Sequence, residues 1–216
     1  MNASSNARLV LCVYALLWAL PATAQDGKAL FATCAACHGA DATGNPATGA
    51  PALAGQDAKY LERQLANFRS GLRGADPRDT YGQQMRAASA VLPGAAAITA
   101  VSSHLSKLRA NVLKPSPKAD LRNGNNLYHG KCGACHGGRA EGNAALGAPR
   151  LSGLDADYIR RQIGDFKSGL RGSDPNDRYG RQMRLMAATL ASDKDLDDVI
   201  AYMHAQGAAP KPAPVK

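Results

Sequence analysis

The chain has 216 residues, of which 45% are hydrophobic and 20% charged, as is ordinary for a globular protein. That length allows one large domain or two small ones, and the composition excludes a chain that is disordered throughout. The formal net charge is +9, but no dense run of lysine and arginine with interleaved aromatic residues occurs. A nucleic-acid-binding function is therefore not supported.

The first 24 residues have the pattern of a secretory signal peptide. Arg8 provides the basic start, residues 9–20 form an apolar run, and a small-residue cleavage site ends at Ala24. The run is shorter than the roughly 20 apolar residues that span a bilayer, so an uncleaved anchor is the minority alternative. Cys12 lies inside the run rather than at the cleavage point, which disfavours a lipoprotein. We expect an exported chain that begins near Gln25.

Four cysteines remain after residue 24, and all of them lie in two CxxC pairs. CAACHG begins at Cys34 and CGACHG begins at Cys132, which leaves no cysteine for a structural disulfide. In an oxidising compartment, each pair must either form a local disulfide or be consumed in another covalent bond.

The chain after the signal peptide is an internal repeat with a spacing of 98 residues. The segments 68–86 and 166–184 are identical at 14 of 19 positions without a gap. A repeat this long indicates two domains of one fold rather than a solenoid. We assign residues 25–113 to the first domain, 114–119 to a proline-containing linker, 120–207 to the second domain and 208–216 to a disordered tail.

Both halves have helical periodicity. Apolar residues recur at spacings of four, three and four from Leu61 to Leu72 and from Ile159 to Leu170. Asp57 and Asp155 are placed to cap these helices. A further apolar helix is expected near the end of each half. Because no convincing period-two pattern occurs, we predict an all-α fold.

The residue after each cysteine pair favours one chemistry over the others. Two cysteines three apart on a helix lie on one face, where they reach the two vinyl groups of one porphyrin edge. The histidines that follow, His38 and His136, are then placed to bind iron. The CxxCH motif is typical of covalent haem attachment, here through Cys34, Cys37, Cys132 and Cys135.

Two alternatives to haem are weaker. A thioredoxin-like dithiol needs a βαβ setting, which a helical chain does not provide. Zinc needs four ligands, and no second repeated pair completes a tetrahedron. We therefore expect two covalently bound haem c groups.

The repeat also selects a second iron ligand for each haem. Met85 is the only methionine of the first half after export, and a shift of 98 carries it onto Met183. None of the three spare histidines repeats: in this alignment His129 falls on Phe31, for example. Met186 and Met203 lie at helical spacing among apolar residues, which predicts core packing. Thioether ligation raises the reduction potential and fills the sixth iron position.

With two CxxCH motifs, two downstream methionines and two homologous halves after a signal peptide, the chain resembles the cytochrome c4 family of dihaem class I cytochromes c. The resemblance covers essentially all of residues 25–207. It implies two cytochrome c domains about a pseudo-twofold axis, with haem propionates approaching each other at the interface, in the bacterial periplasm. It also implies that the carbonyls of Pro51 and Pro149 orient His38 and His136. Tyrosines and arginines that recur in both halves would contact the haems: Tyr60, Tyr158, Tyr81, Tyr179, Arg73 and Arg171.

The function that follows is one-electron transfer in a respiratory chain, without catalysis. The expected partners are redox proteins such as a terminal oxidase, a quinol-oxidising complex or a dehydrogenase. Residues 25–216 carry a net charge of +8, which also allows peripheral association with an anionic membrane. One alternative is the dihaem subunit of a flavocytochrome c sulfide dehydrogenase. A catalytic dihaem enzyme is disfavoured, because the repeated methionines would close both irons.

Overall fold

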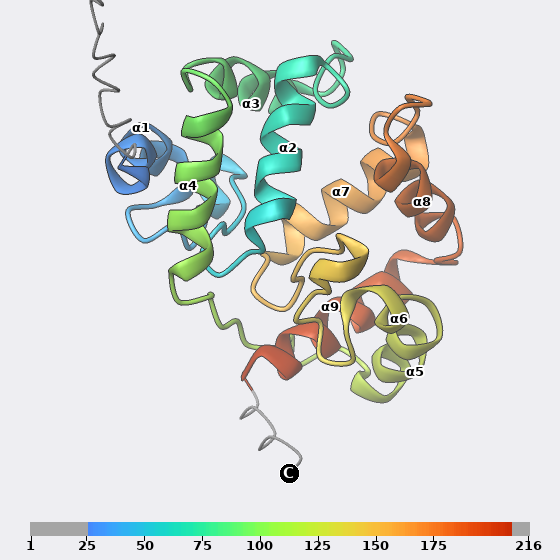
Figure 1. Ribbon diagram of the computed structural model, residues 1–216. Coiled ribbons are helices and arrows are strands. Elements are labelled where there is room, and N and C mark those ends of the chain that lie inside the picture. Colours follow the sequence, from blue (N-terminus) through green and yellow to red (C-terminus); the bar gives the residue numbers. More distant parts are fainter. Residues whose placement is uncertain (1–25, 209–216) are drawn as a thin grey trace, which may run out of the picture.

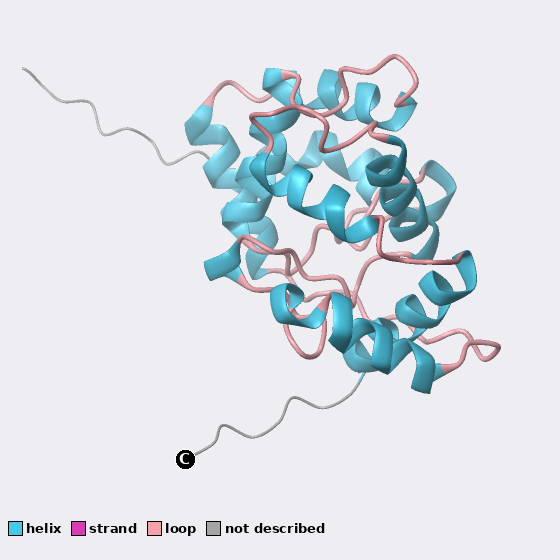
Figure 2. Ribbon diagram, turned by 90° about the vertical axis from the view of Figure 1, so that its right-hand side faces the viewer, coloured by secondary structure: helices cyan, strands magenta, loops and turns pink. Residues whose placement is uncertain are grey.

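The computed structural model describes residues 26–208, and this part of the chain contains helices and loops without a strand (Figures 1 and 2). The all-α prediction is confirmed. The predicted signal peptide and nearly all of the predicted tail lie outside the described residues. Within residues 26–208 no single helix is long and apolar enough to cross a membrane. Two consecutive helices joined at a sharp bend, Thr80–Ala90 and Ala95–Lys107, reach the required length and apolar composition only when taken together.

The two halves repeat one sequence of elements. The first contains α1 (Gly27–His38), a 3₁₀ turn η1 (Pro46–Thr48), α2 (Ala58–Ser70), α3 (Thr80–Ala90) and α4 (Ala95–Lys107). The second contains α5 (Leu121–Lys131), α6 (Gly133–His136), η2 (Ala144–Leu146), α7 (Ala156–Ser168), α8 (Arg178–Ala187) and α9 (Asp193–Ala208). Helices α2 and α7 lie at the junction of the halves (Figure 1).

Aspartates begin most of the long helices. The side chains of Asp57 and Asp155 accept hydrogen bonds from backbone amides in the first turns of α2 and α7, as predicted. Asp79 and Asp177 cap α3 and α8 in the same way. These caps fix where each helix begins and hence the orientation of its inward face.

Each half has its own apolar core. Buried residues of the first core include Phe31, Leu61, Val101 and Leu105. The second core includes Tyr128, Ile159, Val199, Ile200 and Met203. The last helix of each half packs across the first, α4 on α1 and α9 on α5, so both cores form around a crossing of terminal helices.

One of the two predictions of core packing for methionine is wrong. Met203 is 2% exposed, as expected, but Met186 is 39% exposed. The inward face of α8 is formed by Gly180 and Ala187, which are buried, and by the half-buried Met183. Met186 lies at the edge of the buried face of α8. The rest of the protein covers only one side of this short helix, so Met186 remains exposed.

The sequence alignment of Phe31 with His129 is also wrong by one residue. A Cβ atom on Gly27 would lie 2.2 Å from the Ala100 carbonyl oxygen, and one on Gly124 would lie 2.1 Å from that of Asp198. The glycines are therefore equivalent, which pairs Phe31 with the fully buried Tyr128. The second half carries an extra residue before its histidine, and the helix breaks there between α5 and α6 at Cys132.

Gly124 is required at the crossing of α5 and α9. The variant Gly124→Ala would force its Cβ against the Asp198 carbonyl oxygen, so we expect the free energy of unfolding to fall by about 2 to 3 kcal/mol. Gly130 on the same helix has open space around it, and Gly130→Ala should leave stability equal or raise it by up to about 1 kcal/mol. Urea unfolding of the haem-loaded proteins measures both, and equal shifts of the two midpoints would contradict the packing argument.

Candidate functional site

One cysteine of each CxxC pair packs against the apolar core of its half, and the other faces solvent. Cys34 and Cys132 are half-buried against apolar residues, and Cys37 and Cys135 are exposed. None of the four forms a disulfide. Burial raises the pKa of the Cys34 thiol, and it raises the pKa of Cys132 to about 11. Because redox dithiols work with a lowered thiol pKa, the environment disfavours that chemistry.

Both motif histidines are buried and held by one nitrogen. His38 is 4% exposed and His136 is 5% exposed. The Nδ1 atom of His38 lies 2.8 Å from the Pro51 carbonyl oxygen, and that of His136 lies 2.9 Å from the Pro149 carbonyl oxygen. A carbonyl only accepts, so Nδ1 donates and Nε2 keeps its lone pair for a metal. Burial also lowers the pKa of both histidines, which favours the neutral ligand form.

A tight loop returns each proline to its histidine. In the first half, the amide of Gly44 donates to the His38 carbonyl, and Asn45 pairs with Ala50 in a short bridge. Gly44 has φ of +88°, and a Cβ there would lie 2.7 Å from the Ala52 amide nitrogen. Gly142 has the same φ and the same close approach, to Arg150, in the second half. The loop that follows each histidine therefore determines where the proline carbonyl lies relative to the histidine ring.

The candidate methionine ligands occupy equivalent places. Met85 lies on α3 between the buried residues Gly82 and Ser89, and Met183 lies on α8 between Gly180 and Ala187. Both methionines are half-buried on the inward side of their helices.

The spare histidines have other partners. His204 Nε2 lies 2.9 Å from the Leu154 carbonyl oxygen, and His129 Nε2 lies 2.9 Å from the Tyr202 hydroxyl. The ring of His104 packs against Phe31. No group of three histidine, cysteine, aspartate or glutamate side chains able to hold a metal occurs in the described part of the chain.

Two of the repeated arginines meet between the domains. Arg73 donates to the amide oxygen of Gln64 at 2.8 Å and to that of Gln162 at 2.6 Å. Arg171 donates to the same two oxygens, at 2.9 Å and 2.6 Å. Tyr158 adds a longer contact of 3.5 Å to Arg73. The four side chains form a closed ring with one arginine and one glutamine from each half.

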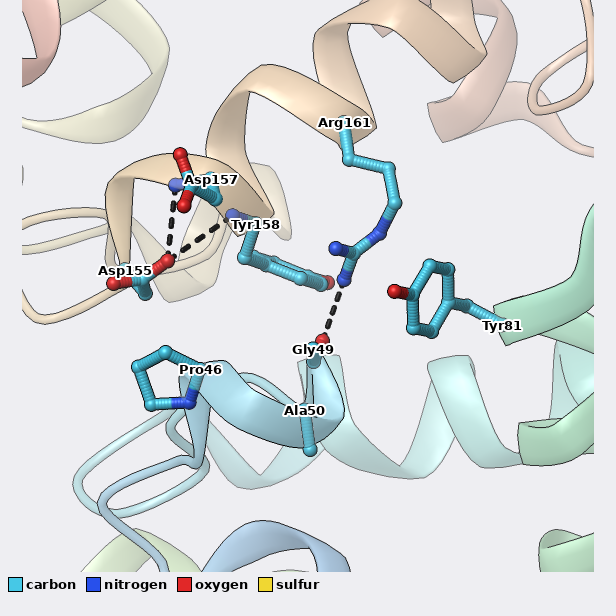
Figure 3. Close-up of a pocket in the computed structure, with 8 residues that line it drawn as sticks. All are labelled: Pro46, Gly49, Ala50, Tyr81, Asp155, Asp157, Tyr158 and Arg161. Carbon is cyan, nitrogen blue, oxygen red and sulfur yellow. Dashed lines mark hydrogen bonds between the residues drawn. The ribbon is translucent and has the colours of Figure 1, made fainter.

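A second pair of arginines links the halves further out. Arg63 donates to the Gly147 carbonyl oxygen at 2.6 Å, and Arg161 donates to that of Gly49 at 2.5 Å. The Arg161 guanidinium also lies over the ring of Tyr81, 4.0 Å from its centroid (Figure 3). Arg63 lies in the same way over the ring of Tyr179 at 4.1 Å. Each of these contacts has its equivalent 98 residues away in the other half. The two halves are therefore related by an approximate twofold axis at this interface.

A small polar cavity of about 180 Å³ opens beside this contact. Figure 3 shows Arg161 reaching from α7 toward Gly49, with Tyr158 beside it and Asp155 capping the helix. It is lined by residues of both halves: Pro46, Gly49, Ala50, Tyr81, Asp155, Asp157, Tyr158 and Arg161.

Sequence reasoning selected Arg73, Arg171 and the tyrosines, but it missed the arginines and glutamines that complete the interface. Arg63 with Arg161, and Gln64 with Gln162, are identical at the 98-residue spacing, so the repeat contains the signal. Their partners are invisible in the sequence, because each contact joins residues about 80 to 110 positions apart.

Two tandem helical domains, each with a CxxCH motif, a buried histidine with a free Nε2 and an inward methionine, define a dihaem c-type cytochrome. The cytochrome c family model matches residues 24–109 and 121–206, more than half of the chain. The chain belongs to the cytochrome c family and, within it, to the cytochrome c4 family of dihaem electron-transfer proteins. It carries two covalently bound haem c groups, at Cys34 with Cys37 and at Cys132 with Cys135.

Individual relatives agree with this assignment. The chain is 31% identical over 192 residues to cytochrome c4 of Azotobacter vinelandii, covering 84% of this chain and 87% of the relative. It is 33% identical over 204 residues to the thiosulfate dehydrogenase electron acceptor of Stutzerimonas stutzeri, covering 88% and 90%. The crystal structure of reduced recombinant cytochrome c4 from Pseudomonas stutzeri superposes with a TM-score of 0.68 at 29% identity, covering 82% and 95%.

Proposed function

We propose that this dihaem electron carrier works in the periplasm and holds its irons between His38 and Met85 and between His136 and Met183. One observation carries the ligand assignment. In both halves a buried histidine commits Nδ1 to a proline carbonyl, and the shift that relates the histidines also relates the two inward methionines. A c-type haem supplies a reversible one-electron couple. Histidine and methionine together leave the iron no open position, which favours a carrier over a catalyst.

The interdomain arginines are proposed to balance the carboxylates of the haems. Arg73 and Arg171 have neutral amide oxygens as their short hydrogen-bond acceptors. Burial, and then the positive charge of Arg73, lowers the pKa of Arg171. Two guanidinium groups this close favour an anion nearby, and haem propionates are such anions. Tyr60 and Tyr158, with Arg63 and Arg161, would complete this environment.

Export is part of the proposal. Residues 1–24 would be removed near Ala24, as the basic start, apolar run and small residues before the cleavage point indicate. The cytochrome c4 relatives support an exported protein. Its partners are redox proteins, for which the oxidase subunits and the thiosulfate dehydrogenase acceptor among the relatives give support.

Reductive titration and spectroscopy test the carrier function. The exported, haem-loaded protein should take up two electrons per chain, and its ferric form should show the methionine-to-iron charge-transfer band at the intensity of two haems. Absence of the band would overturn the ligand assignment. Rapid binding of cyanide or carbon monoxide at both irons would overturn the closed-site carrier.

A second candidate names the electron donor. The 33% identity to a thiosulfate dehydrogenase electron acceptor favours a dehydrogenase that oxidises thiosulfate. Catalytic amounts of a thiosulfate dehydrogenase with thiosulfate should then reduce both haems, whereas thiosulfate alone should not. A role as the haem subunit of an oxidoreductase is compatible with the same relatives, and stable co-purification with an enzyme would favour it over a free carrier.

A further inference from the structure

Helix α8 presents large apolar side chains to solvent. Leu185 is 73% exposed and Met186 is 39% exposed. Residues two apart on a helix point about 200° apart, so Leu185 points away from the side that carries Met183. The equivalent positions on α3 of the first domain hold only Ala87 and Ala88. An exposed leucine beside an exposed methionine is therefore a feature of one domain and not of the repeat.

The same face of the second domain is strongly basic. Arg178, Arg181 and Arg184 are exposed, and α8 contains no acidic residue. The aspartate that precedes it, Asp177, is 6% exposed and is used in capping the helix. Helix α3 has a single arginine, Arg86. We call Arg178, Arg181, Arg184, Leu185 and Met186 the α8 patch.

Three of the acidic side chains that flank α8 along the chain have hydrogen-bond donors of their own. Asp174 accepts from the Asn176 backbone amide, Asp195 from Asn123 of α5 and Asp197 from Arg160 of α7. Asp193, at the start of α9, is exposed. The α8 patch itself contains three arginines and no acidic residue.

The α8 patch also lies next to a haem attachment segment. The Lys131 ammonium donates to the Thr189 carbonyl oxygen at 2.9 Å, and Lys131 immediately precedes Cys132. This contact places the C-terminal end of α8 beside the CxxCH motif of the second domain. In the first domain the residue before Cys34 is Thr33, whose hydroxyl is used locally on the Leu30 carbonyl oxygen.

We propose that the α8 patch is the docking surface through which the second domain exchanges electrons with a redox protein that presents an apolar centre rimmed by carboxylates. Apolar contact with Leu185 and Met186 would exclude water, and the arginines would steer and orient an acidic partner. In each encounter one electron passes from the partner's reduced cofactor to the ferric haem of the second domain, with no proton or bond change in this chain. The inference rests on the electron-carrier function and adds a domain preference and a class of partner.

The internal repeat provides a matched exchange of residues. Arg181→Gln with Leu185→Ala gives α8 the residues of α3 at these two positions, and Gln83→Arg with Ala87→Leu does the reverse in the first domain. The probe is flavodoxin hydroquinone, a small acidic flavoprotein that becomes the semiquinone when it donates one electron. At low ionic strength we expect the α8 variant to be reduced about tenfold more slowly than the wild type, and salt to diminish the difference. Amide shifts on addition of oxidised flavodoxin should map to α8 in the wild type and be lost in this variant.

Reduction by ascorbate, a small molecule that needs no docking surface, tests the carrier function independently of the α8 patch. Both variants should react with ascorbate as the wild type does, and failure of ascorbate to reduce the wild type would count against the carrier itself. Equal flavodoxin rates for the wild type and the α8 variant would overturn the docking surface. So would a wild-type dimer that the variant converts to monomer, or Leu185-dependent binding to anionic phosphatidylglycerol vesicles with unchanged flavodoxin kinetics.

Discussion

Replacing Met183 with histidine is expected to remove half of the methionine-to-iron charge-transfer band and to lower the reduction potential of one haem. Thioether ligation favours ferrous iron more than imidazole ligation does. The potential should fall by roughly one to a few hundred mV, within the range of about 0.8 V that axial ligands control. Met85→His should remove the other half, because the two methionines occupy equivalent places on α3 and α8. Potentiometric titration and ferric absorption spectra measure both effects.

The other methionines of the second half provide controls. Met186 is exposed at the border of α8, and Met203 is buried in the second core. Met186→Leu and Met203→Leu should keep the full band, although Met203→Leu can cost up to about 1.5 kcal/mol of stability. If Met186→Leu abolished half of the band and Met183→Leu did not, the assignment by the 98-residue repeat would be wrong.

The chemistry of this protein was predictable because short motifs determine it locally. CxxCH places three groups within five residues of one another, and the internal repeat acts as a second copy against which each candidate is checked. His204 fails that check, and the structure shows it bonded to a core carbonyl. The fold class followed in the same way from helical spacing and aspartate caps, which are also local signals.

The errors arose where local signals do not determine the outcome. Met186 has an apolar neighbourhood in sequence, but whether it is buried depends on which side of α8 is covered. The pairing of Phe31 with His129 failed because a constant shift cannot represent one extra residue, whereas the close crossings at Gly27 and Gly124 reveal it. The interface was missed because its residues become partners only when the two domains meet.

The second large effect is expected at the interface between the two domains. Gln162→Leu should lower the free energy of unfolding by about 3 kcal/mol. The Gln162 oxygen accepts from Arg73 and from Arg171, each at 2.6 Å, and its amide nitrogen donates to Asp165 at 2.8 Å. Leucine leaves two N–H groups of charged side chains and one carboxylate oxygen without these partners in a partly buried interface, where each loss costs about 1 kcal/mol.

Two further variants serve as comparisons. Gln64→Leu removes the equivalent oxygen of the first half. The first half has Asn67 where the second half has Asp165, so we expect a somewhat smaller loss in the free energy of unfolding. Gln84→Leu, on the exposed side of α3, should change stability by no more than about 0.5 kcal/mol. In urea, the wild type should unfold in one transition, whereas the Gln162→Leu variant should unfold in two transitions, one for each domain. If Gln162→Leu matched Gln84→Leu in midpoint and cooperativity, the haem carboxylates alone would hold the arginines, and the glutamine ring would contribute nothing to joining the domains.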